Sequence, residues 1–164
     1  MSDYPHAQSS YQLRFEWGAA GAAAILDGAD AVVWVDQLGT EPVPKLSVPV
    51  IGGGLRNAAA VAGWVLAQQS AVGGRFTVAV VAAGATRPDG SLRFAVEDLL
   101  GAGAVIDALA ELGIDHSSPE AAAAAAAYTG LKQSVRHLLS ASATARETGS
   151  VIDLTVSDEV PLLA

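Results

Sequence analysis

Three consecutive glycines followed by an arginine and an asparagine are the most informative chemical feature of the sequence. The segment reads VPVIGGGLRNAAAVAGW, so the glycines link a short apolar run to a helical pattern. Glycines let backbone N–H groups approach a ligand, and the amino end of a helix favours an anion. We therefore expect Gly53, Gly54, Arg56 and Asn57 to bind a small anionic group, with the two side chains as added donors. A turn that only permits tight packing of strand on helix explains the pattern equally well, since it is neither GxGxxG nor a P-loop.

Three carboxylates stand where the ends of strands and helices could bring them together. Asp36 ends an apolar run, and Glu97 and Asp98 fall in the first turn of a predicted helix. In open α/β sheets ligands bind beyond the carboxyl ends of the strands, and carboxylate oxygens suit Mg²⁺. These positions allow a Mg²⁺ site formed by Asp36 together with Glu97 or Asp98. The competing interpretations are that Asp36 is a turn residue and that the other two cap a helix.

Other catalytic arrangements find little support. His6, His116 and His137 are isolated from one another and form no metal motif, and there is no cysteine. No GxSxG segment is present, and no aspartate pair of the haloacid-dehalogenase kind follows a strand.

Apolar runs that alternate with helical patterns predict the frame for these residues. We expect strands at 30–36, 48–51, 75–83 and 151–156, and loops at 37–47 and 84–94. We expect helices at 18–28, about 55–69, about 95–112, from 118 through the alanines at 121–127, and at 131–147. This order predicts one three-layer α/β/α sandwich over residues 11–164, after a flexible tail at 1–10.

Two glycines interrupt the predicted helix that begins near Ala95. Gly101 and Gly103 lie in its segment LLGAGAVI, and together they cost about 2 kcal/mol relative to alanine. We expect this cost to be offset by close approach of the helix backbone to a neighbour or a ligand.

Composition narrows the classes of partner. The 164 residues carry 17 acidic and 9 basic side chains, a net charge of -8, and the arginines are spread along the chain. Such a chain repels nucleic acid, and because its arginines are dispersed, we expect any anion that they bind to be small. We expect no membrane association, because no apolar run approaches the roughly 18 residues of a spanning helix. Without a signal-peptide pattern or a cysteine we expect a cytoplasmic protein, and homo-oligomer formation is left open.

Several segments together resemble the 2-phosphosulfolactate phosphatase family of coenzyme M biosynthesis. They are RFEWGAAGA, AVVWVD, GLRNAAAVAGW, VAVVAAG, LRFAVEDLLGAGAVIDAL, SPEAAAA and SASATARETG, and their order and spacing fit from Gly52 onward. The resemblance implies an α/β/α phosphohydrolase that uses Mg²⁺ and converts 2-phosphosulfolactate to sulfolactate and phosphate. It implies that Asp36 is an active-site carboxylate, that Glu97 and Asp98 are its acidic partners, and that the turn 52–57 holds an anionic group.

The sequence also departs from the family's pattern. Asp36 is followed by QLGTEPVPKL, only residues 37–51 replace a longer stretch, and Ala85 stands where the family has a carboxylate. The segment SATARE at 142–147 lacks the family's glycine. These departures favour an alternative, a non-catalytic member that binds a small anion or acts as an interaction protein. A nucleotide-binding oxidoreductase is a more distant third hypothesis, because no acidic residue completes a dinucleotide fingerprint.

Overall fold

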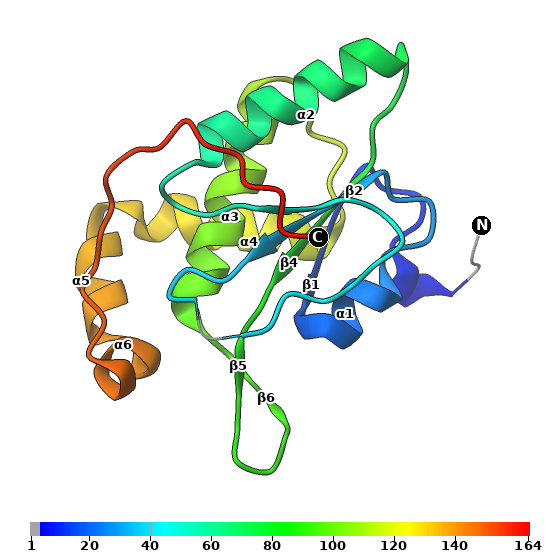
Figure 1. Cartoon of the computed structure of the whole chain (residues 1–164). Helices are drawn as coiled ribbons and strands as arrows, with labels where there is room; N and C mark the ends of the chain where they lie inside the picture. Colours follow the sequence, from blue (N-terminus) through cyan, green and yellow to red (C-terminus); the bar gives the residue numbers. More distant parts are fainter. Residues whose placement is uncertain (1–3, 40) are drawn as a thin grey trace.

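A parallel sheet of four strands forms the centre of the molecule (Figure 1). The computed structural model describes residues 4–39 and 41–164. The strand order is β1 (Leu13–Trp17), β4 (Val78–Ala82), β2 (Ala31–Val35) and β3 (Val50–Gly52). Every residue of β2 and β4 is buried, and both strands are continuous apolar runs. A parallel sheet covered on both faces requires such runs.

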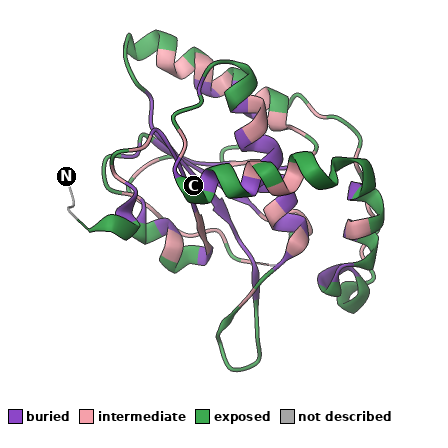
Figure 2. Cartoon of the chain, turned by 180° about the vertical axis from the view of Figure 1, so that it is seen from behind, coloured by how far each residue is buried: buried purple, intermediate pink, exposed green. Residues whose placement is uncertain are grey.

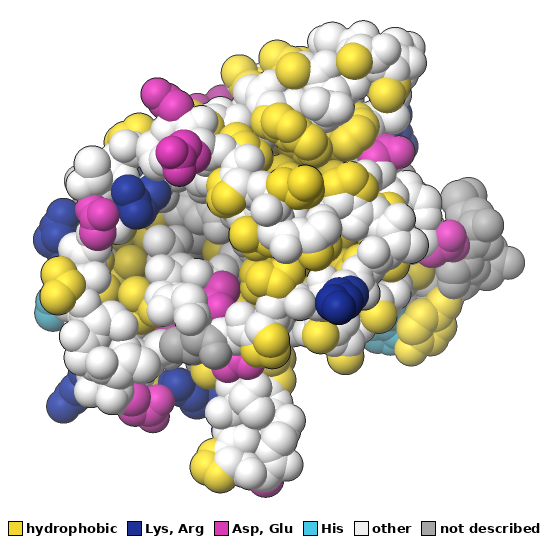
Figure 3. Space-filling model, viewed as in Figure 1, with side chains coloured by type: hydrophobic (Ala, Val, Ile, Leu, Met, Phe, Trp, Pro, Cys, Tyr) yellow, Lys and Arg dark blue, Asp and Glu magenta, His cyan; other side chains and the backbone are white. Residues whose placement is uncertain are grey.

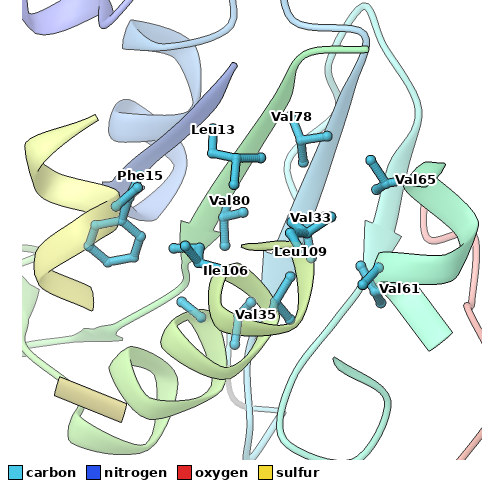
Figure 4. Packing of buried hydrophobic residues seen from close by; sticks show 14 of the residues in the cluster. Leu13, Phe15, Val33, Val35, Val61, Val65, Val78, Val80, Ile106 and Leu109 are labelled. Carbon is cyan, nitrogen blue, oxygen red and sulfur yellow. The ribbon is translucent and has the colours of Figure 1, made fainter. Parts of the chain in front are cut away.

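Three helices cover one face of this sheet. They are α2 (Ala58–Val72), α3 (Val96–Glu111) and α4 (Pro119–Leu131). Figure 4 shows side chains from β2 and β4 packed against α2 and α3, and the labelled set includes Val33, Val35, Val78, Val80, Val61, Val65, Ile106 and Leu109. This is the larger of the two clusters that flank the sheet, so the main core lies on this side.

The opposite face is covered by α1 (Gly18–Ala24) and by the coil that joins β2 to β3. Val32 and Trp34, which alternate with the residues that face α2 and α3, pack here with Ile25. Val43, Leu46 and Val48 of the coil pack against the same cluster. The predicted α/β/α sandwich is therefore confirmed, with one layer shared between a short helix and a loop.

Close helix packing explains the glycines of α3. A Cβ atom on Gly103 would lie 2.2 Å from the carbonyl oxygen of Ala124 in α4. A Cβ atom on Gly101 would lie 2.8 Å from both the Val35 and the Gln37 side chains. The predicted approach of this helix to a neighbour is confirmed.

The remaining elements lie outside the sheet and its two covering layers. The short strands β5 (Ala85–Thr86) and β6 (Leu92–Arg93) form an antiparallel hairpin that projects from the body of the molecule (Figure 1). The smaller helices are η1 (Pro5–Ala7), η2 (Lys132–Ser134), α5 (Val135–Ala141) and α6 (Ala143–Thr148). Figure 2 shows the sheet buried and much of the hairpin and the outer helical surfaces exposed. Among the described residues no helix is long and apolar enough to cross a bilayer.

The prediction of strands has two errors: one strand was missed, and one was predicted that does not form. β1 was not predicted, because Arg14 and Glu16 interrupt its apolar pattern. Residues 151–156 were predicted as a strand but form none, although exposed and half-buried residues do alternate at 151–155. Ile152 and Leu154 pack beside Leu139 of α5, while Val151, Asp153 and Thr155 are exposed. The pattern therefore reflects an extended segment lying on helices.

Several helix and loop boundaries also differ from prediction. The predicted helix at 131–147 is divided, because the Ser142 hydroxyl accepts a hydrogen bond from the Ala145 N–H at 3.2 Å and begins α6 there. The helix predicted at 18–28 ends at Ala24, α2 begins at Ala58, and the loop at 84–94 contains the hairpin.

Part of the predicted tail packs on the domain. Residues 1–3 lie outside the described residues. In the segment that follows, Ala7 is buried, and the Gln8 side chain both donates to the Phe15 carbonyl at 2.8 Å and accepts from the Phe15 N–H at 3.0 Å. These contacts attach η1 to β1.

Candidate functional site

A pocket of about 440 Å³ lies at the carboxyl ends of β2 and β3. The loop after β2, the glycine turn after β3 (residues 52–57) and the C-terminal segment (residues 150–164) each form part of its wall. Its lining comprises Trp34, Asp36, Gln37, Gly39, Glu41, Val43, Gly52, Gly53, Gly54, Arg56, Asn57, Ser157, Glu159, Pro161 and Leu163. Five of these, Asp36, Gly53, Gly54, Arg56 and Asn57, are residues that the sequence predicts for the site.

Asp36 lines this pocket and also organises the loop that follows it. Its Oδ1 accepts a hydrogen bond from the Gly39 N–H at 3.0 Å, and its Oδ2 accepts one from the Glu41 N–H at 2.7 Å. These bonds are those of a turn residue, so the interpretation of Asp36 as a turn former is supported. The side chain is half-buried and belongs to the pocket wall, so its role in the loop does not remove it from the site.

Asp98 is directed at the backbone instead of the pocket. It is 1 % exposed, and its two carboxylate oxygens accept the N–H groups of Gln37 at 2.8 Å and Gly84 at 2.9 Å. Burial raises the pKa of Asp98 to about 8, although the N–H group of Gln37 favours the charged form. The negative charges of Asp36 and Glu97 nearby raise this pKa further. Asp98 therefore holds the ends of β2 and β4 together.

The three predicted carboxylates do not form a ready-made metal site. Glu97 is 2 % exposed, and neither it nor Asp98 lines the pocket that contains Asp36. Within residues 4–39 and 41–164, no three His, Cys, Asp or Glu side chains are arranged to hold a metal ion. Asp36 is therefore a candidate ligand in the pocket, whereas Glu97 and Asp98 are buried at the start of α3. The three-carboxylate ligand set stays a prediction.

Packing determines the shape of the glycine turn. A Cβ atom on Gly53 would lie 2.4 Å from Cγ1 of Val33, and one on Gly54 would lie 2.5 Å from Oε1 of Gln37. The same Gln37 oxygen accepts the N–H of Leu55 at 2.9 Å, so this N–H is not available to an anion. The packing interpretation of the glycines is supported, and the donors that remain for a ligand are mainly side chains.

Arg56 and Asn57 supply those side chains, and both contact the C-terminal segment. Arg56 Nε donates to the Thr155 carbonyl at 2.8 Å, and its Nη1 lies 3.4 Å from the Asp153 carboxylate. Asn57 Nδ2 donates to the Glu159 carbonyl at 2.9 Å and to the Gly52 carbonyl at 3.1 Å. The Arg56 side chain is 44 % exposed, so a ligand that enters the pocket can compete with these contacts.

The C-terminal segment is a part of the site that sequence reasoning missed. Leu163 N–H donates to the Val50 carbonyl at 2.7 Å, and Gly52 N–H donates to the Pro161 carbonyl at 2.8 Å. The segment thus runs antiparallel to β3 at the edge of the sheet. Its signal in the sequence, the apolar run VPLL, is too short to indicate a strand by itself.

Acidic side chains outnumber basic ones around the pocket. Asp36, Glu41 and Glu159 line it, against Arg56 alone of the lining arginines and lysines. Figure 3 shows acidic and basic side chains interspersed on the face viewed there. An anionic ligand is therefore repelled by the carboxylates and attracted by the guanidinium.

Comparison with known proteins gives one family match. A family model described as 2-phosphosulpholactate phosphatase matches residues 24–159, a range that contains every site residue predicted from the sequence. The matched range includes β2 and Asp36 as well as the residues from Gly52 onward. A search of curated proteins finds no match.

Proposed function

We propose that this chain, which belongs to the 2-phosphosulpholactate phosphatase family, hydrolyses 2-phosphosulfolactate or a similar small phosphorylated hydroxy acid. The products would be the free hydroxy acid and phosphate. The observation that carries the proposal is the pocket that unites Asp36 with Arg56 and Asn57 at the carboxyl ends of parallel strands. Ligand sites of open α/β sheets lie at this edge.

The chain's own residues suggest how such a substrate would lie. Arg56 supplies a charge-assisted donor for phosphate oxygens. The Asn57 amide can supply a neutral donor when a ligand displaces its bond to the Glu159 carbonyl. Val43, Pro161 and Leu163 form an apolar part of the wall, against which the carbon skeleton can pack. Asp36 stands on the polar side, where it can orient a water molecule toward the phosphorus.

Mg²⁺ is part of this proposal, with Asp36 as the protein ligand. Protein sites often hold Mg²⁺ through one or two carboxylates together with substrate phosphate and water. When bound, the ion would neutralise phosphoryl charge and activate water. The excess of carboxylates around the pocket supports a cation here, because Arg56 alone does not balance Asp36, Glu41 and Glu159.

We propose that turnover is weak. Ala85 provides no carboxylate, and the carboxylate of Asp98 accepts two backbone N–H groups instead of facing the pocket. Loss of one polar contact in a site of this kind can lower the rate by about two orders of magnitude. The same observations favour a second candidate, a non-catalytic member of the family that binds a small phosphorylated acid in this pocket.

A substrate panel tests the proposal. Phosphate release is measured with 2-phosphosulfolactate, 2-phospholactate and p-nitrophenyl phosphate, each with Mg²⁺ and with a chelator. We expect slow, Mg²⁺-dependent release that favours the two hydroxy-acid phosphates. Binding of these compounds, measured by calorimetry, without phosphate release would support the non-catalytic candidate. Faster phosphate release from p-nitrophenyl phosphate than from the hydroxy-acid phosphates would contradict the substrate class.

A further inference from the structure

Trp34 carries an unsatisfied hydrogen-bond donor at the pocket. The residue lies in β2, is 3 % exposed and belongs to the pocket wall. Among the described residues, its Nε1 is the one buried side-chain nitrogen or oxygen atom without a hydrogen-bond partner. Buried indole N–H groups usually have a partner, because an unpaired donor away from water is unfavourable.

The position of this donor points to a ligand. The other buried polar groups around the pocket are paired within the protein, as the carboxylate of Asp98 illustrates with its two backbone N–H partners. Trp34 instead lies among apolar neighbours, including Val43, where the protein supplies no acceptor. Because Nε1 has almost no accessible surface in this structure, the side chains beside it must shift to admit a ligand. An acceptor that the ligand then places there would satisfy the indole without breaking an existing hydrogen bond.

The chemistry of the two sides of the pocket indicates which group of the ligand would accept the hydrogen bond from Trp34. A phosphate with two charges suits Arg56 and Asn57, which offer a guanidinium and an amide. A single neutral donor among apolar groups cannot offset the desolvation of a dianion, whereas a delocalised monoanion is desolvated more easily. Sulfonate and carboxylate are groups of that second kind.

We propose that Trp34 is a specificity-determining residue of this pocket. Its Nε1–H donates a hydrogen bond to an oxygen of the sulfonate or carboxylate that the ligand carries besides its phosphate. The inference rests on the proposed function, in that the ligand is taken to be a small phosphorylated hydroxy acid. It gives this chain a means to distinguish such acids from simple phosphate monoesters.

Indole N–H resonances of the intact protein test the inference directly. The chain has three tryptophans, so three indole signals are expected, and the spectrum of Trp34→Phe identifies that of Trp34. The wild type is titrated with 2-phosphosulfolactate, sulfolactate, 2-phospholactate and inorganic phosphate. We expect the Trp34 indole proton to move downfield with the first three compounds and to stay in place with phosphate. A signal that moves with none of them, or equally with phosphate, would overturn the inference.

Affinity provides the second test. Trp34→Phe keeps an aromatic ring but removes the donor and part of the buried ring system, so we expect about tenfold weaker binding of 2-phosphosulfolactate and unchanged binding of inorganic phosphate. Equal affinity of variant and wild type for 2-phosphosulfolactate would contradict the proposed hydrogen bond. If Trp34→Phe fails to fold, the wild-type titration decides the matter, with the Trp34 signal identified by sequential assignment.

The two proposals can fail separately. A Trp34 signal that shifts with sulfolactate in a protein that releases no phosphate would retain the specificity role and remove catalysis. Phosphate release without any shift of the Trp34 signal would retain catalysis and overturn the specificity role.

Discussion

Oδ1 of Asp98 lies 2.8 Å from the backbone nitrogen of Gln37, so the first turn of α3 fixes the residue that follows Asp36. The other oxygen of Asp98 accepts the N–H of Gly84, just beyond β4. One buried carboxylate thereby determines where the chain leaves two neighbouring strands. The position of Asp36 in the pocket depends on this arrangement.

Asp98 should make stability depend on pH. Its pKa is raised to about 8 in the folded protein, mainly by burial, and is about 4 in an unfolded chain. Between these values the folded state keeps a proton that the unfolded state releases, so the free energy of unfolding falls as pH rises. We expect the fall to reach at most about 1.4 kcal/mol per pH unit, measured by urea unfolding from pH 4.5 to 8.5.

Asp98→Asn isolates this contribution. The amide cannot ionise, so the variant should lose much of the fall in stability while being less stable at pH 5, where one backbone N–H loses its acceptor. The exposed Asp115→Asn is the matched control and should keep the wild-type pH dependence. An unchanged slope in Asp98→Asn would show that Asp98 is already ionised at pH 5.

Gly103 should tolerate no side chain. The Cβ atom of Gly103→Ala would lie 2.2 Å from the Ala124 carbonyl oxygen, so α3 and α4 must separate. We expect a loss of about 1–3 kcal/mol in the free energy of unfolding, measured by chemical denaturation. Gly63→Ala in α2 is the control, because a Cβ atom there meets nothing within 4 Å and alanine favours the helix by up to about 1 kcal/mol. Similar effects from both substitutions would contradict the packing argument.

Arg56 should affect binding more than stability. Its ion pair with Asp153 is exposed, so Arg56→Ala should lower the free energy of unfolding by less than about 1 kcal/mol. Loss of the charge-assisted donor should weaken binding of 2-phosphosulfolactate about tenfold or more, measured by calorimetry. Arg136→Ala is the control, because Arg136 also bonds the C-terminal segment, at the Ile152 carbonyl, but does not line the pocket. Equal affinity in the two variants would remove Arg56 from the site.

The buried apolar strands were predictable, whereas the amphipathic edge strand was not. β2 and β4 are runs whose burial follows directly from their residues. β1 contains Arg14, which is buried and donates to the carbonyls of Ile25 at 2.8 Å and Asp27 at 2.6 Å. Burial lowers the pKa of this guanidinium, and its hydrogen bonds offset the desolvation. These partners lie 11 and 13 residues further along the chain, so they cannot be recognised from the strand alone.

The candidate site was predictable in its backbone frame and less so in its side chains. The rule that ligands lie at carboxyl ends of parallel strands placed Asp36 beside the glycine turn. The same rule did not reveal that Glu97 and Asp98 point into the protein, because the direction of a side chain in a first helical turn depends on tertiary packing. It also gave no indication of the C-terminal segment, whose contact with β3 is made through backbone groups of Leu163 and Gly52.

Phosphate release from 2-phosphosulfolactate by wild type and Asp36→Asn, with Mg²⁺ and with a chelator, tests the central claim most directly. Asp115→Asn serves as the control for charge, and unchanged melting of Asp36→Asn excludes loss of the loop that Asp36 organises. We predict slow release by the wild type and by Asp115→Asn that requires Mg²⁺, and release about 100-fold lower in Asp36→Asn. Absence of release by the wild type, or release that neither Asp36→Asn nor the chelator reduces, would contradict a phosphatase centred on Asp36.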